Sequence, residues 1–109
     1  MPATGIPDEI KTQVEQRITA FNRAVVKDPN VAYRSRYRGA FLYLDRDDYG
    51  QLTHICRLRY TGAMDAWEFS IYTYSDERYN PQEWFFPGSG HVDGTIEGAM
   101  RAGLEAYPP

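Results

Sequence analysis

Arginine and tyrosine residues recur along the middle of this chain at a spacing that could hold a binding partner. Side chains two positions apart on a β-strand point to the same face, and the arginines alternate in this way on two neighbouring runs. Arginine pairs bidentately with carboxylates and phosphates and stacks on aromatic rings, which lysine does not do. The residues assigned to this surface, called here the Arg/Tyr face, are Arg34, Arg36, Arg38, Arg57, Arg59, Tyr72 and Tyr74.

Such a face could serve two kinds of partner. Tyrosine and arginine are enriched in protein interfaces, so the first expectation is a protein partner or self-association as a homo-oligomer. The alternative is single-stranded nucleic acid, whose bases would stack on the tyrosines while the guanidinium groups hold phosphates. A third interpretation is a merely solvated face, whose arginines pair with acidic residues of neighbouring strands or of another protomer.

A weaker candidate is a metal site formed by His54, Cys56, His91 and Asp93. Imidazole, thiolate and carboxylate can complete a tetrahedral zinc shell, and alternate strand positions would put His54 and Cys56 on one face. Structural zinc sites usually carry paired Cys-x-x-Cys spacing, which this chain lacks. A buried cysteine beside a half-buried histidine is the simpler interpretation, so no metal or other cofactor is expected.

Catalysis by Cys56 with a histidine base would need an accessible thiolate in an electropositive site. Arg57 and Arg59 should point to the opposite side of their strand from Cys56. Asp45, Asp47 and Asp48 are interpreted as turn residues. No acid, base and nucleophile converge, so a zinc-dependent or cysteine-based small enzyme ranks behind a non-catalytic binding or assembly module.

Length and composition fit one folded domain over 1–109. The chain has 42% hydrophobic and 25% charged residues and 15% aromatics, too apolar and too mixed for disorder. It shows no secretory signal, no long apolar run and a single cysteine. The expectation is a soluble cytoplasmic protein that contacts no membrane.

Charge is distributed unevenly along the chain, whose net charge is −3. Residues 33–62 carry six arginines against three aspartates, whereas residues 63–109 carry two arginines against eight carboxylates. The acidic total argues against a protein whose whole surface binds a polyanion. The chain is therefore basic in its middle and acidic at its end.

Helical periodicity appears at both ends of the chain. Residues 7–27 place apolar side chains at spacings of three and four, and Asp28-Pro29 ends that helix. Asp93 is predicted to cap a second helix that is rich in glycine and alanine. Its small residues predict close packing on the sheet or on a partner helix.

The region between the helices is predicted to be strands. Val31–Arg46 is interpreted as one strand with a bend or bulge at Gly39, followed by an Asp-rich turn over 45–50. Strands over 52–61 and from Trp67 follow, with His54 and Cys56 expected to face inward. The segment 75–90 should be a loop that covers buried aromatics, with at most an edge strand near 84–86.

These elements predict an α+β fold: an N-terminal helix, a three- or four-stranded antiparallel meander and a C-terminal helix, with both helices on one face of the sheet. The element order resembles that of double-stranded-RNA-binding domains. That family needs a basic cluster at the start of its last helix, where this chain has Asp93 and Glu97 before a lone Arg101. Membership of that family is therefore rejected.

Overall fold

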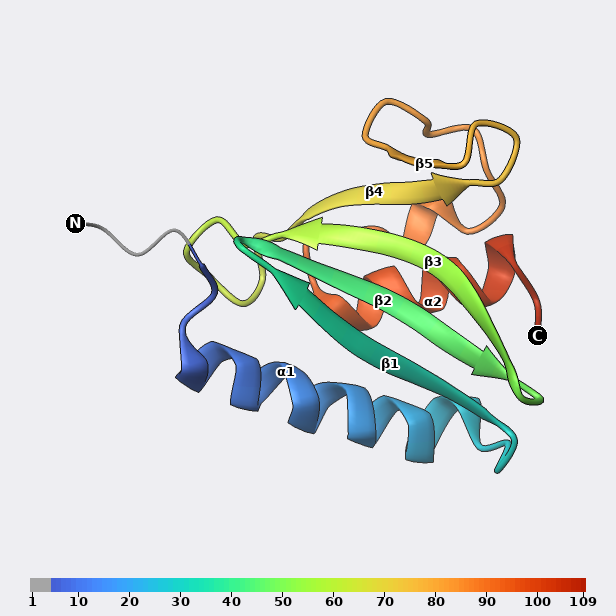
Figure 1. Cartoon of the computed structure of the whole chain (residues 1–109), viewed down its shortest axis with the longest axis horizontal. Coiled ribbons are helices and arrows are strands. Elements are labelled where there is room, and N and C mark those ends of the chain that lie inside the picture. The colour runs from blue at the N-terminus through green and yellow to red at the C-terminus, as the bar shows by residue number, and fades with distance from the viewer. Residues whose placement is uncertain (1–4) are drawn as a thin grey trace.

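A five-stranded antiparallel meander lies between two helices in the chain order (Figure 1). The computed structural model describes residues 5–109. Both helices cover one face of the sheet, which confirms the predicted α+β arrangement with one strand or two more than expected. The elements are α1 (Asp8–Phe21) with a π-helical continuation (Asn22–Val26), β1 (Val31–Arg38), β2 (Phe41–Asp48), β3 (Gln51–Arg59), β4 (Glu68–Thr73), β5 (Arg78–Asn80), a 3-10 turn (Ser89–His91) and α2 (Ile96–Ala106).

The strand predicted over Val31–Arg46 is in fact a hairpin of β1 and β2. Arg38 pairs with Phe41, which leaves Gly39 and Ala40 as a two-residue turn. Gly39 has φ +58°, the positive value that such hairpin turns need at their first central position. The apolar run after Gly39 therefore starts a new strand rather than continuing a bent one.

The predicted turn over 45–50 is also shorter than expected. β2 continues to Asp48, and only Tyr49 and Gly50 form the turn to β3, both with positive φ. Tyr49 Oη donates to Asp28 at 2.7 Å, which helps to hold this turn. Asp45 and Asp47 consequently lie within a strand, where they face basic residues of β1.

A β-bulge in β3 reverses the predicted position of His54. Leu44 pairs with Cys56 and Asp45 pairs with His54, so Ile55 is an extra residue in the register. Ile55 and Cys56 are both fully buried on the helix-covered side. Two consecutive inward residues shift the alternation by one, so His54 lies on the opposite side of the sheet and not beside Cys56.

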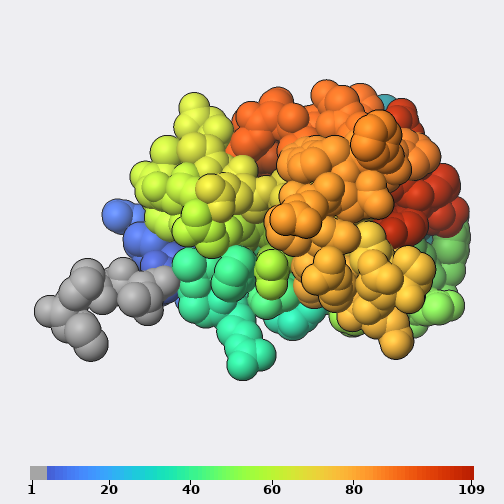
Figure 2. Space-filling model, turned by 90° about the horizontal axis from the view of Figure 1, so that it is seen from above, coloured from blue at the N-terminus to red at the C-terminus, as the bar shows by residue number. Residues whose placement is uncertain are grey.

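The segment after β4 differs from its prediction in two respects. Its short edge strand is β5 (Arg78–Asn80), not the stretch 84–86. The aromatics of that stretch are not all buried, because Phe85 is fully exposed and Trp84 is half-exposed. Figure 2, a view from above, shows the segment that follows β5, coloured orange, at the molecular surface.

Helix α2 begins two residues later than predicted. Thr95 is its N-cap and accepts from the Gly98 amide at 3.0 Å, while Asp93 accepts from the Thr95 amide at 3.0 Å. The expected close packing is present on the sheet: an added Cβ at Gly103 would overlap Ile55 and the Tyr33 hydroxyl. The absence of a side chain lets the helix backbone approach the strands.

The buried core fills the space between the helices and the inner sheet face, with Val14, Ile18 and Leu44 among its members. Arg46 is buried there as well. Its guanidinium donates to Asp48 and to the carbonyl oxygens of Gly103 and Tyr107 at the end of α2. These bonds satisfy carbonyls that a helix C-terminus otherwise leaves unpaired.

The free edge of β1, where no neighbouring strand pairs with it, is partly occupied by Asn22 and Asp28. Asn22 Nδ2 donates to the Tyr33 carbonyl at 3.1 Å, and Asn22 Oδ1 accepts from the Tyr33 amide at 2.8 Å. The Val31 amide donates to the Asp28 carbonyl at 3.1 Å. Asn22 therefore takes the place that a residue of a neighbouring strand would have.

No helix among residues 5–109 has the length and apolar character needed to cross a bilayer.

Candidate binding surface on the outer sheet face

The side of the sheet away from the helices, called here the outer face, carries the predicted arginines. Arg36 pairs across the hairpin with Tyr43, and Arg57 pairs with both Tyr43 and Ser70. Directly paired residues of neighbouring strands project to the same face, so these side chains share one surface. Tyr72 lies there too, whereas Tyr74 follows the end of β4 and stands at the rim.

Three of the arginines are paired with carboxylates of the same face. Arg34 Nη2 lies 3.3 Å from Asp47 Oδ2, Arg36 Nε lies 3.1 Å from Asp45 Oδ2, and an Arg59 nitrogen lies 2.5 Å from Glu68 Oε1. Each of these arginine side chains remains 48% exposed or more. The pairs reduce the positive charge of the surface and hold the guanidinium groups in place.

Asp45 is the most enclosed group of this face, with its side chain only 5% exposed. Arg36 donates to one of its oxygens, and His54 Nδ1 lies 2.9 Å from the other. The hydrogen bond to Asp45 raises the pKa of Arg36. His54 thus has one ring nitrogen fixed on the carboxylate, and its side chain is 42% exposed.

The guanidinium of Arg57 has no carboxylate partner among residues 5–109 and is held by aromatic rings instead. It lies 4.4 Å from the ring centre of Phe41 and 5.5 Å from that of Tyr79. Arg36 lies 4.4 Å from the ring centre of Tyr43. Cation–π contacts of this kind keep a long side chain flat on the sheet.

Tyrosine rings connect the central strands to β5. Tyr79 lies 5.1 Å from Tyr43 and 4.9 Å from Tyr72, and Tyr72 lies 4.8 Å from Tyr74, all edge to face. Arg36 Nη2 also donates to Tyr79 Oη at 3.4 Å. Burial raises the pKa of Tyr79 to about 12.

A hollow of about 230 Å³ opens near β4 at one side of this surface. Arg57 and Arg59 are its basic lining residues, and Glu68, which also lines it, is paired with Arg59. The residues that line it are Phe41, Arg57, Arg59, Glu68, Phe69, Ser70 and Pro81.

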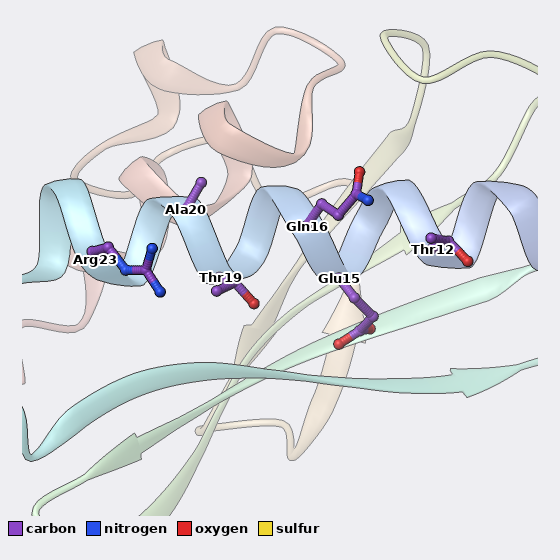
Figure 3. A pocket seen from close by; sticks show the side chains of 6 residues that line it. All are labelled: Thr12, Glu15, Gln16, Thr19, Ala20 and Arg23. Atoms are coloured by element: carbon purple, nitrogen blue, oxygen red, sulfur yellow. The ribbon is translucent and has the colours of Figure 1, made fainter.

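A larger hollow of about 500 Å³ follows α1, but its residues do not converge on a common point. Figure 3 shows side chains spread along one flank of a single helix. All six are exposed residues of that flank. The open helix surface offers no arrangement of functional groups comparable with that of the sheet. Its lining residues are Thr12, Glu15, Gln16, Thr19, Ala20 and Arg23.

The four candidate metal ligands are not brought together. Cys56 is buried on the inner face, His54 is on the outer face, and Asp93 is engaged by Thr95 before α2. His91 lies 3.6 Å from Glu105 instead. No group of three possible ligands lies close enough to share a metal ion within residues 5–109.

Cys56 also lacks the surroundings of a catalytic nucleophile. Burial raises the pKa of its thiol, which disfavours the thiolate. The histidine predicted beside it projects from the other side of the sheet.

Several residues of the surface were missed by sequence reasoning. Asp45 was assigned to a turn, and Tyr43 and Tyr79 were not assigned to the Arg/Tyr face. The consecutive apolar pair Ile55-Cys56 inside an otherwise alternating strand was the available signal for the bulge that turns His54 outward. β5 carries Tyr79 but is too short to show a pattern.

No protein-family model, no curated protein and no solved structure matches the chain. Its function is therefore argued from its own residues.

Proposed function

We propose that this chain is a non-catalytic binding and assembly module whose outer sheet face contacts a protein, in the first place a second copy of itself. The observation that carries the proposal is the pre-ordered state of the arginines. Arg36 is held by Asp45 and Tyr43, and Arg57 is held by Phe41 and Tyr79. Side chains already held in position lose little conformational freedom on binding.

The charge balance of this face favours a protein over a polyanion. A phosphate that approaches Arg34, Arg36 or Arg59 meets the carboxylate to which each is paired. A protein surface can present both signs of charge, so it can complement such pairs without breaking them. Aromatic and arginine side chains are also the usual energetic centres of protein interfaces.

Single-stranded nucleic acid is the second candidate, favoured by one group of contacts. Arg57 lies among rings rather than carboxylates, and Tyr72 and Tyr79 present edge-to-face rings beside it. Bases could stack on rings in such a setting while Arg57 and Arg38 contact phosphates.

The test combines solution mass with oligonucleotide titration. Sedimentation equilibrium of the wild-type chain should give a mass of two chains that falls when Arg36→Ala and Tyr72→Ala are combined. Arg23→Ala, on the flank of α1, is the control and should leave the mass unchanged. Circular dichroism establishes that each variant is folded.

Two results would decide against self-association. A single-chain mass at all concentrations, with oligonucleotide binding that weakens steeply as salt is added, would assign the face to nucleic acid. A single-chain mass with no oligonucleotide binding would remove both proposals for this surface.

A further inference from the structure

Ser70 on β4 carries a hydroxyl that no other group of the described chain engages. The residue is only 7% exposed, and no hydrogen bond joins its Oγ to another group of residues 5–109. Polar side chains this deeply buried normally have a partner, because an unmade hydrogen bond costs free energy. Ser70 lines the hollow beside β4, so its hydroxyl is available to a group that enters there.

The hollow exists because β5 stops short of Ser70. Ile71 and Asn80 form the last pair between β4 and β5, and Pro81 comes next in the chain. Proline has no amide hydrogen with which to continue the ladder. The part of β4 that contains Ser70 therefore pairs with β3 alone, and a hollow of about 230 Å³ opens beside it.

Arg57 gives this hollow a positive charge that no carboxylate of residues 5–109 is paired with. Arg57 and Ser70 are directly paired between β3 and β4, so their side chains project to the same outer face. The other charged lining residues pair with each other, with Arg59 Nε 2.7 Å from Glu68 Oε1. Two arginines and one glutamate leave the lining with a net charge of +1.

The charge and the walls of the hollow define the class of ligand that it fits. A guanidinium binds a carboxylate through two parallel hydrogen bonds, and a serine hydroxyl can donate a third. One negative charge balances the lining, whereas a doubly charged phosphate would also be repelled by Glu68. Phe41 and Pro81 supply apolar walls beside these polar groups.

The size of the hollow limits the ligand to about one ring. Its volume of about 230 Å³ exceeds the roughly 150 Å³ in which a protein cavity accommodates benzene. It is smaller than the roughly 300 Å³ at which pockets for drug-sized ligands begin. A carboxylate carried on a single ring satisfies both limits.

We propose that this hollow binds a small aromatic carboxylic acid, whose carboxylate accepts hydrogen bonds from Arg57 and from Ser70 Oγ. The ring of the acid contacts Phe41 and Pro81. The Arg57 guanidinium is already held 4.4 Å from the ring centre of Phe41 and 5.5 Å from that of Tyr79, so it loses little freedom on binding. This site goes beyond the proposed assembly function, because a single chain contains every group that it uses.

The first experiment is an NMR titration of the isotope-labelled chain with phenylacetate. The signals of the Arg57 Nε–H group and of the Ser70 amide should shift and saturate. Phenylacetamide is the matched control compound, because it has nearly the same shape without the charge. It should bind at least about tenfold more weakly, since hydrogen bonds to charged groups are the stronger ones. Equal affinity for the two compounds would overturn the inference.

The second experiment repeats this titration with variants whose folding is checked by circular dichroism. Arg57→Gln should weaken phenylacetate binding at least about tenfold, and Ser70→Ala, which removes only the hydroxyl, about fivefold. Arg34→Gln is the control, because it removes the same charge from the outer face at a residue that does not line the hollow. Equal losses in Arg34→Gln and Arg57→Gln would reveal general attraction to a basic surface and overturn the site.

Two further probes test other sources of the same charge. Inorganic phosphate that binds more tightly than phenylacetate would assign the hollow to phosphates instead of a carboxylic acid. A short peptide that ends in phenylalanine presents the same ring and carboxylate on a chain, and tighter binding of that peptide would assign the hollow to a protein terminus. No shift with phenylacetate would rule out the site, while the solution mass would still test self-association separately.

Discussion

The two faces of the sheet each hold an arginine among an aspartate and a tyrosine, yet the two groups differ in exposure. Arg46 on the inner face contacts Asp48, Tyr33 and the carbonyls of Gly103 and Tyr107, and its side chain is 0% exposed. Arg36 on the outer face contacts Asp45 and Tyr79 and is 48% exposed.

The difference shows that enclosure, and not residue type, decides what such a group does. The inner group is closed by α2, whose C-terminal carbonyls accept from Arg46, so its donors serve the fold. The outer group is only partly enclosed: Asp45 is 5% exposed, whereas the side chains of Arg36 and His54 are 48% and 42% exposed.

Arg46→Ala should have the largest effect. It leaves Asp48 and two helix carbonyls without their buried donor, and removal of one partner from a buried ion pair typically costs about 3–5 kcal/mol. The free energy of unfolding in urea measures this loss. Arg36→Ala is the matched variant and should cost less, because Arg36 is 48% exposed and His54 still contacts Asp45 after the change. Equal losses would contradict the contrast between the faces.

Gly103→Ala should have the next largest effect on stability. Alanine usually favours a helix over glycine, but a Cβ here would overlap Ile55 and the Tyr33 hydroxyl of the inner face. Overpacking of this kind costs about 1–3 kcal/mol. Thermal and urea unfolding give the value. Gly90→Ala, where a Cβ meets nothing within 4 Å, is the control. A more stable Gly103→Ala variant would show that the inner face can accommodate the added methyl group.

Asp45→Asn should cost about 1.5 kcal/mol or somewhat more, since hydrogen bonds to charged groups contribute roughly that amount. The variant keeps the shape of the carboxylate but removes the charge held between Arg36 and His54. Urea unfolding should detect the loss, and nitrogen NMR should show a changed His54 ring. Asp47→Asn, whose carboxylate is more exposed, is the control. No difference between the two would mean that Asp45 does not organise the outer face.

Ionisation of Tyr79 should cause a small loss of stability at alkaline pH. Burial raises its pKa from 10.0 to about 12, so the folded chain retains the proton in a range where the unfolded chain releases it. The contribution of Tyr79 to the free energy of unfolding is fully present below pH 10 and is lost as the pH rises toward 12. Urea midpoints across this range give the slope. Tyr79→Phe should have a shallower slope, and an unchanged slope would show that Tyr79 is freely hydrated.

The helices and the arginine alternation could be predicted because their signals are periodic and local. Val14 and Ile18 mark the buried stripe of α1, and Arg34 and Arg36 alternate along β1 as expected for one face of a strand. These patterns involve only residues that are close together in the sequence.

The missed features depend on pairing between strands. The positive φ of Gly39 makes a hairpin turn, although the apolar residues after it also fit a bent strand. Asp45 looks like a turn residue until Arg36 and His54 are placed beside it. The extra residue Ile55 moves His54 to the other face, a change that strict alternation cannot represent. Phe85 shows its exposure only once Trp84 and Phe86 are packed on Phe69.

The hydrogen bonds of Asn22 restrict how the sheet can be extended at β1. Strand edges with unpaired main-chain groups recruit further strands, and repeated recruitment ends in fibres. At β1 the chain fills part of that edge itself, with Asn22 on Tyr33 and Asp28 on Val31. Another molecule cannot extend the sheet along this stretch without first displacing Asn22. Strand addition at this stretch of β1 therefore requires Asn22 to leave its hydrogen bonds with Tyr33 first.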